Sequence, residues 1–287
     1  MEYKIGLSRN VSGDVETLLE NYKKAGLSAL EISPMDLAPG VYESLDYKRI
    51  AAAAKANDIT LWSLHLPFWP FEQLEISKRD LCKNTVAYLS EIIAKASDVG
   101  VDKFVIHPSG EPIEDGERLD RMACAKESLY TLAEYAKTKG AVIAVEDLPR
   151  TCLGRSSDEI LELISAHDDL RVCFDTNHLL NGEDPADFIR KIGKKLITLH
   201  VSDYDFVNER HWLPGEGKID WQAMLKALEE VGYNGVWLYE ISARCPNSII
   251  RDRDLVCEDF VRNAKELFAG KTPTVFSSPK PNLGYWE

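Results

Sequence analysis

Short apolar runs alternate with segments of helical periodicity along the whole of this chain. The apolar runs predict eight strands, at residues 4–8, 29–33, 60–66, 103–107, 142–147, 171–176, 196–202 and 235–241. The segments between and after them predict eight helices, at about 14–25, 45–57, 78–99, 117–139, 157–166, 184–193, 220–231 and 254–268. Such alternation is typical of parallel strands joined by crossover helices. We therefore predict a single α/β domain, a (β/α)8 barrel over residues 1–269, followed by an extended C-terminal tail over residues 270–287.

An open doubly wound sheet is the alternative arrangement for the same pattern. It is disfavoured because no glycine-rich dinucleotide-binding turn follows the first predicted strand. The three prolines of the tail, Pro273, Pro279 and Pro281, favour extended chain that wraps the barrel or a partner subunit. A homo-oligomer is therefore left open.

Composition and charge restrict the classes of partner. The formal net charge of −13 repels polyanions and argues against a broad nucleic-acid surface. No run of about 18 apolar residues suggests a membrane span, and the first residues do not resemble a secretory leader. The six cysteines are far apart and form no CxxC pair, so we expect reduced thiols and a cytoplasmic protein.

Four successive predicted strands end in an acid or a histidine: Glu146, Asp175, His200 and Glu240. An ionisable group at the end of a buried strand is costly unless it is used. Three carboxylates and one imidazole delivered by neighbouring strands suit one divalent ion. Because carboxylates outnumber the imidazole, Mn, Mg or Co is favoured, and Zn becomes an alternative if further histidines join the site.

Side-chain alternation along the strands predicts which groups enter the barrel. Residues of the same parity as the four strand-end groups should point inward, and bulky residues such as Val145, Phe174, Ile197 and Trp237 should face the helices. The same parity places Glu31, His65 and His107 inward at the carboxyl ends of earlier strands, which is the catalytic face of such barrels. We interpret these three as substrate contacts, with a second metal as the alternative for the two histidines.

Two loops add further candidates for substrate binding. His178 follows Asp175 by three residues, and Arg210 and His211 lie in the long loop after the seventh strand. In that loop Gly215 and Gly217 suggest a tight turn. His167 has no comparable context and is expected at the surface.

These residues resemble the xylose isomerase-like barrel superfamily, and within it the sugar phosphate isomerase/epimerase group. The matching segments are 106–108, 145–146, 175–178, 199–203, 211–221 and 239–240. The resemblance implies that Glu146, Asp175, His200 and Glu240 bind a divalent ion, that the two glutamates flank the sugar, and that His178 contacts a substrate oxygen. Ketose 3-epimerases of the group carry an arginine six residues after the metal histidine, where this chain has Phe206, so Arg210 would have to substitute.

The chain also resembles endonuclease IV, which uses three zinc ions on the same barrel. Its nine ligand positions match residues 65, 107, 146, 175, 178, 200, 209, 211 and 240. The glycine-rich segment that follows the strand-five glutamate in that family is replaced here by Asp147-Leu148-Pro149. A multi-zinc phosphodiesterase therefore remains an alternative.

The ligand set predicts a metal-dependent isomerase or epimerase that acts on a small carbohydrate or its phosphate. Glu146 and Glu240 would be the acid/base pair that removes and returns a proton beside a carbonyl, through an enediolate that the metal stabilises. Dehydration of a keto-sugar or an inositol-type ketone would use the same intermediate, and a noncatalytic sugar-binding subunit is a further alternative.

Overall fold

The computed structural model describes residues 2–11, 13–33, 40–281 and 283–284. Parts of the predicted barrel and tail that fall on the other residues lie outside this description. Within it, eight parallel strands form one sheet in the order β7-β6-β5-β4-β3-β2-β1-β8. They are β1 (Lys4–Arg9), β2 (Ala29–Ile32), β3 (Thr60–His65), β4 (Lys103–Ile106), β5 (Val142–Glu146), β6 (Arg171–Asp175), β7 (Leu196–His200) and β8 (Val236–Tyr239).

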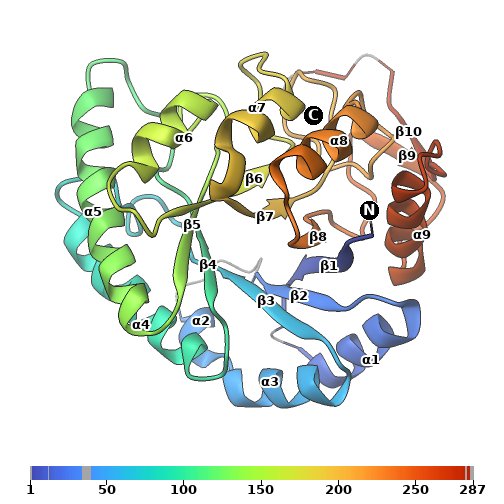
Figure 1. Ribbon diagram of the computed structural model, residues 1–287, viewed down its shortest axis with the longest axis horizontal. Coiled ribbons are helices and arrows are strands. Elements are labelled where there is room, and N and C mark those ends of the chain that lie inside the picture. The colour runs from blue at the N-terminus through green and yellow to red at the C-terminus, as the bar shows by residue number, and fades with distance from the viewer. Residues whose placement is uncertain (1, 12, 34–39, 282, 285–287) are drawn as a thin grey trace.

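The sheet closes between its two ends, β7 and β8. The amide of Val201 donates to the carbonyl of Leu238 at 2.8 Å, and a parallel bridge joins Val201 to Tyr239. Figure 1 shows the strands at the centre with the helices around them. The predicted (β/α)8 barrel is confirmed.

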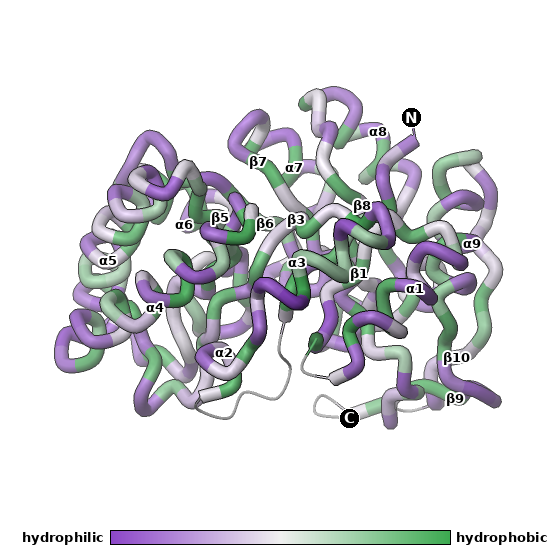
Figure 2. The backbone as a smooth tube through the Cα atoms, turned by 90° about the horizontal axis from the view of Figure 1, so that it is seen from below, coloured by the Kyte–Doolittle hydropathy of each residue, from purple (hydrophilic) through white to green (hydrophobic). Residues whose placement is uncertain are grey.

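Helices follow the strands and form the outer layer. Their bounds are α1 (Val15–Ala25), α2 (Val41–Ser44), α3 (Tyr47–Ala56), α4 (Cys82–Ser97), α5 (Arg118–Thr138), α6 (Ser157–Ile164), α7 (Pro185–Ile192), α8 (Trp221–Val231) and α9 (Cys257–Phe268), with a short 3-10 turn, η1 (Gly193–Lys195). Local signals set their ends: the Asp14 and Asp220 side chains cap α1 and α8, and Gly26 and Gly232 end them in the left-handed conformation. Figure 2 shows hydrophobic residues along the strands and many hydrophilic residues on the helices around them.

The barrel interior contains small apolar clusters that are separate from the layer between strands and helices. One cluster joins Val105, Ala144 and Cys173, which have the parity predicted to face inward. Ile197 packs against this cluster, so the prediction that it faces the helices is wrong. The reason is an irregularity in the pairing of β6 with β7 beside Val172 and Cys173, which interrupts the alternation at Ile197.

The tail folds back onto the protein instead of leaving it. Its residues Ser277–Pro279 form β10, which pairs antiparallel with β9 (Ile249–Arg251), a strand that the sequence pattern did not predict. Figure 2 shows this pair beside the C-terminal end. The division of the chain at residue 269 remains a prediction. In the part of the chain that the model describes, no helix has the length and apolarity needed to cross a membrane.

The barrel interior requires a glycine at position 6. An added Cβ would lie 2.9 Å from the carbonyl oxygen of Ala29 and 2.9 Å from Cδ1 of Leu238, which belongs to the neighbouring strand on the other side. We expect Gly6→Ala to lower the thermal midpoint by about 3–10 °C because overpacking a core costs about 1–3 kcal/mol.

Circular dichroism during heating measures this midpoint. Gly116→Ala is the matched control, because a Cβ there meets no atom within 4 Å. An equal midpoint for the two variants would contradict the predicted close approach inside the barrel.

Candidate active site

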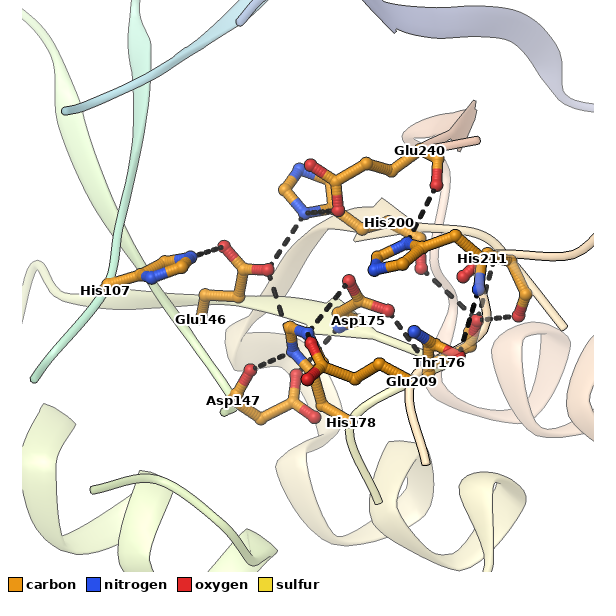
Figure 3. Close-up of polar contacts among 12 residues, drawn as sticks. His107, Glu146, Asp147, Asp175, Thr176, His178, His200, Glu209, His211 and Glu240 are labelled. Carbon is orange, nitrogen blue, oxygen red and sulfur yellow. Dashed lines mark hydrogen bonds and ion pairs between the residues drawn. The ribbon is translucent and has the colours of Figure 1, made fainter. Parts of the chain in front are cut away.

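The four strand-end groups converge at the carboxyl end of the barrel. Glu146, Asp175 and His200 are the last residues of β5, β6 and β7, and Glu240 follows β8. One ligand atom from each lies within 4.8 Å of the corresponding atoms of the other three. Figure 3 shows these side chains directed toward one another. The predicted juxtaposition is therefore present, and its assignment as a metal site remains a prediction.

Glu146 is the centre of the polar contacts. Its Oε2 lies 3.1 Å from Nε2 of His65 and 3.3 Å from Nε2 of His107, and its Oε1 lies 3.1 Å from Nδ1 of His200. Burial disfavours the charged carboxylate, but His200 and His107 outweigh it and hold the pKa of Glu146 well below its usual range. Glu146 is thus an anion surrounded by imidazoles.

His200 is fully buried and meets a carboxylate on each side of its ring. Nε2 lies 2.9 Å from Oε1 of Glu31, and Nδ1 faces Glu146 and, at 3.2 Å, Oε2 of Glu240. Burial opposes protonation, yet the surrounding anionic groups raise the pKa of His200 well above its usual value. With Nε2 directed at Glu31, Nδ1 is the ring atom available to a cation.

Glu31 occupies a different place from the one predicted. Its carboxylate is fully buried and accepts hydrogen bonds from the hydroxyls of Ser8 and Ser63 in addition to its contact with His200. It does not line the cavity described below. The prediction that Glu31 contacts substrate is therefore replaced by a role in orienting His200, the usual arrangement of a carboxylate behind a metal-binding histidine.

Asp175 is the residue whose surroundings best fit a bound cation. Its Oδ1 accepts from the amide of Asn177 at 2.7 Å, while its buried Oδ2 has no hydrogen-bond partner among the described residues. Burial raises the pKa of Asp175 well above its usual value. Among the described residues, the nearest cationic group is Nε2 of His178, 3.5 Å from Oδ2 and beyond a good hydrogen bond. A carboxylate oxygen buried without a hydrogen bond is costly, and a divalent ion supported by the other three strand-end groups would remove that cost. The donor set therefore fits a divalent metal.

A chain of alternating charges extends from His178 along one side of the mouth. Nε2 of His178 lies 3.1 Å from Oε1 of Glu209, Glu209 pairs with Arg150, and Arg150 pairs with Glu111. The other ring nitrogen, Nδ1, donates to the carbonyl of Asp147 at 2.6 Å. The four side chains come from the loops after β6, β7, β5 and β4, so the network ties four loops together.

The long loop after β7 is organised by one buried carboxylate, Asp203. It accepts hydrogen bonds from the amides of Gly215 at 2.7 Å and Ile219 at 3.2 Å, and from the indole of Trp221 at 3.0 Å. Gly217 is needed because an added Cβ would collide with Asp203 and with the carbonyl of Tyr204. The predicted turn at the glycines is present and is a structural feature of this loop.

The same loop carries the remaining predicted contacts. His211 lines the cavity, and its Nδ1 lies 3.2 Å from the carbonyl oxygen of Glu240. The guanidinium of Arg210 is buried, pairs with Asp205 at 3.0 Å and donates to the carbonyl of Gly284. Phe206 packs against Tyr204 and does not line the cavity. Arg210 lines the cavity while Asp205 holds its guanidinium, and its role as a substitute for the arginine of the 3-epimerases remains a prediction.

A cavity of about 450 Å³ lies over the cluster. Its wall includes Glu146 and Glu240 and the predicted substrate contacts His65, His107 and His178. It also includes Arg150, which the sequence reading missed. Arg150 lies outside the predicted strands, and only its position in the loop that follows Glu146 could have suggested it. His167 lies outside the cavity and contacts Glu134 and Tyr130 on the outer surface.

Comparison with known proteins agrees with this geometry. The family model described as xylose isomerase-like TIM barrel matches residues 19–259. The chain belongs to this family. A D-psicose 3-epimerase of Ruminiclostridium cellulolyticum is 26% identical over 82% of this chain and 81% of its own length. An inosose isomerase of Bacillus velezensis is 24% identical over 78% of this chain and 81% of its own.

Other relatives extend the comparison. An uncharacterized protein of Methanocaldococcus jannaschii is 29% identical over 60% of this chain and 61% of its own length. Among solved structures, a D-tagatose 3-epimerase-like protein superposes with a TM-score of 0.73 at 23% identity, over 93% of this chain and 96% of that one. The predicted enzyme class is confirmed at the level of the family, because the relatives named for an activity are isomerases and epimerases.

Metal binding should release protons and tighten as the pH rises. The pKa values of Asp175 and His200 are both raised, so each group keeps its proton to a higher pH than usual, and a cation that binds there must displace it. Titration calorimetry with Mn²⁺ in buffers of different ionisation enthalpy should detect the release. Asp175→Asn should bind at least about 10-fold more weakly and release fewer protons. Affinity that is independent of pH would contradict this assignment.

Proposed function

We propose that the chain is a divalent-metal-dependent sugar epimerase or isomerase that moves a proton beside a carbonyl group. The observation that carries the proposal is the cluster of Glu146, Asp175, His200 and Glu240, of which Glu146 and Glu240 line the cavity, with an oxygen of Asp175 that makes no hydrogen bond among the described residues. The activities named for the relatives support a small carbohydrate as substrate. Mn, Mg or Co is favoured by three carboxylates against one imidazole.

In this proposal the two glutamates are separate proton-transfer groups. They approach His200 from different strands, and Oε1 of Glu146 and Oε2 of Glu240 lie 3.1 and 3.2 Å from the same ring nitrogen. The Glu240 side chain is 22% exposed and that of Glu146 is 1% exposed, so Glu240 reaches a ligand more easily. We assign Glu240 as one proton-transfer group and Glu146 as the other, each acting from its own side of the substrate.

Other residues hold this arrangement in place. Glu31 fixes the ring of His200, and His211 holds the backbone of Glu240. A divalent ion bound by the four ligands would polarise the substrate carbonyl and stabilise the negative charge that develops on its oxygen. His178 lies beside Asp175 and Glu146, where it would position a substrate hydroxyl. Loss of a β-hydroxyl after proton removal would make the same site a dehydratase.

A second candidate is a phosphodiesterase of the endonuclease IV type. It is favoured by one observation: His65, His107 and Glu146 form a second group of close ligand atoms. This reading requires more than one ion per chain, whereas the proposed epimerase or isomerase requires one. Metal analysis of the purified protein distinguishes the two.

Solvent-hydrogen exchange tests the proposed reaction. A panel of ketoses, aldoses and inositol-type ketones, incubated with the Mn-loaded protein in D2O, should include one that gains deuterium next to its carbonyl. Glu240→Gln and Glu146→Gln should each slow this exchange by about 10²–10⁴-fold, because general acid–base catalysis contributes that much.

The matched control is Glu91→Gln on the exposed face of α4, which should exchange at the normal rate. Metal content is measured for each variant, so that loss of the ion is separated from loss of the base. Full exchange by metal-loaded Glu240→Gln would contradict the assignment.

A further inference from the structure

The cavity over the metal-ligand cluster has two chemically different sides. Glu146 and Glu240 of the cluster form the polar floor together with His65, His107 and His178. Much of the remaining wall is apolar and consists of Phe68, Phe71, Leu148, Pro149, Ile241 and Pro246. A cavity of about 450 Å³ is within the range that encloses a drug-sized ligand. A substrate that fills it must present polar groups to the floor and apolar surface to the wall.

Three aromatic side chains continue this apolar wall outward. The ring of Phe68 stacks on His107 with centroids 3.9 Å apart, and Phe71 lies 6.4 Å from Phe68. Trp69 packs edge-on against Phe71 at 4.8 Å and remains 44% exposed. Large exposed aromatic side chains beside a cavity are suited to packing against a ring of a ligand. The aromatic surface thus begins beside the ligand cluster and reaches solvent.

The cavity offers little positive charge to an anionic substrate. Among the described residues, the arginines that line it are Arg9, Arg150 and Arg210, beside four histidines and with no lysine. Arg150 pairs with Glu111 and Glu209, and Arg210 pairs with Asp205. Nη1 of Arg9 donates to the carbonyls of Ser8 and Ile241, and its guanidinium lies over Phe260. Residues 12, 34–39, 282 and 285–287 add no lysine or arginine by sequence.

The backbone donors that could hold a phosphate are also engaged. In barrels that bind phosphate, the loops after strands 7 and 8 often form the site. Here the amides of Gly215 and Ile219 in the loop after β7 donate to the carboxylate of Asp203. These amides are thus satisfied within the protein, and neither Gly215 nor Ile219 is among the residues that line the cavity.

We propose that the substrate is an uncharged ketone of a sugar or cyclitol that carries an apolar ring, such as an aryl group joined through a glycosidic oxygen. The keto-polyol part meets the ligand cluster, and the apolar ring packs against Phe68, Phe71 and Trp69. This proposal rests on the proposed function, because it places the reacting carbonyl at the cluster. The proposed substrate class distinguishes this site from one that binds a sugar phosphate.

A matched substrate series tests the proposal with the Mn-loaded full-length protein. One sugar whose ketone lies away from the anomeric carbon, so that its glycoside keeps the carbonyl, is compared as the free sugar, as its phenyl glycoside and as its phosphate ester, by the rate of deuterium uptake from D2O. We expect kcat/KM to favour the phenyl glycoside over the free sugar by about 10- to 100-fold, since burying one ring of phenylalanine size contributes about 1.5–3 kcal/mol. The phosphate ester should be the poorest of the three.

Variants locate the source of this preference. Phe71→Ala and Trp69→Ala should reduce the ratio between phenyl glycoside and free sugar. Tyr130→Ala, at a half-exposed aromatic residue of α5 outside the cavity, should leave the ratio unchanged. Thermal midpoints confirm that each variant is folded. Equal rates for the free sugar and the phenyl glycoside, or preference for the phosphate ester, would overturn the proposal.

Binding measurements test the proposed substrate class independently of the proposed reaction. If none of the ketones takes up deuterium, the proposed reaction fails, and the ligand preference is then read from thermal shifts. An unreactive phenyl glycoside that stabilises the protein more than the parent sugar and the sugar phosphate supports the substrate class. Equal shifts, or a larger shift with the phosphate, reject it.

Discussion

The concentration of buried negative charge at one end of the barrel is the constraint on which the rest of the site depends. Glu31, Glu146 and Asp175 are at most 1% exposed, and Glu240 lies beside them. Isolated carboxylates at such depth would be too costly to keep ionised. The imidazoles of His65, His107 and His200 compensate Glu146, whereas Oδ2 of Asp175 makes no hydrogen bond among the described residues and lies 3.5 Å from Nε2 of His178. The fold therefore tolerates this charge through histidines, and the donor set could also hold a cation.

Hydrogen bonds around the cluster hold its charged side chains in fixed positions. Each ring nitrogen of His200 faces a carboxylate, so the ring cannot turn without losing one contact. Asp203 fixes the loop after β7 in a comparable way, because its two oxygens accept hydrogen bonds from the amides of Gly215 and Ile219. Hydrogen bonds thus hold the polar groups of the cluster and of this loop in place, and apolar side chains line much of the open part of the cavity.

Much of the fold and of the cluster could be predicted because the signals are local. Strand parity and the position of each strand end place Glu146, Asp175 and His200 together without any knowledge of the rest. The prediction failed where pairing between distant segments decides the outcome. The irregularity between β6 and β7 turned Ile197 inward, and β9 exists only because residues of the tail pair with it.

The roles of individual polar side chains were the hardest to predict. Glu31 shares its parity with the substrate-facing residues, but two serine hydroxyls and His200 hold it below the cavity. Arg210 lies in the expected loop, yet Asp205, five residues earlier, holds its guanidinium. In both cases a neighbour that the strand pattern does not mark determines where the functional group is directed. Metal identity, oligomeric state and cellular location remain predictions.

The charged series of Glu111, Arg150, Glu209 and His178 has a consequence for exchanging parts between members of this family. Because each side chain comes from a different loop, a loop transplanted alone would leave a buried charge without its counterpart. The loops after β4, β5, β6 and β7 therefore have to be exchanged together, and a functional chimera would carry all four. The loop after β3 is tied to the same assembly, because its Glu75 accepts a hydrogen bond from the amide of Gly110 in the loop after β4 and pairs with Arg121 of α5, so a new specificity on this barrel would require these loops to change together.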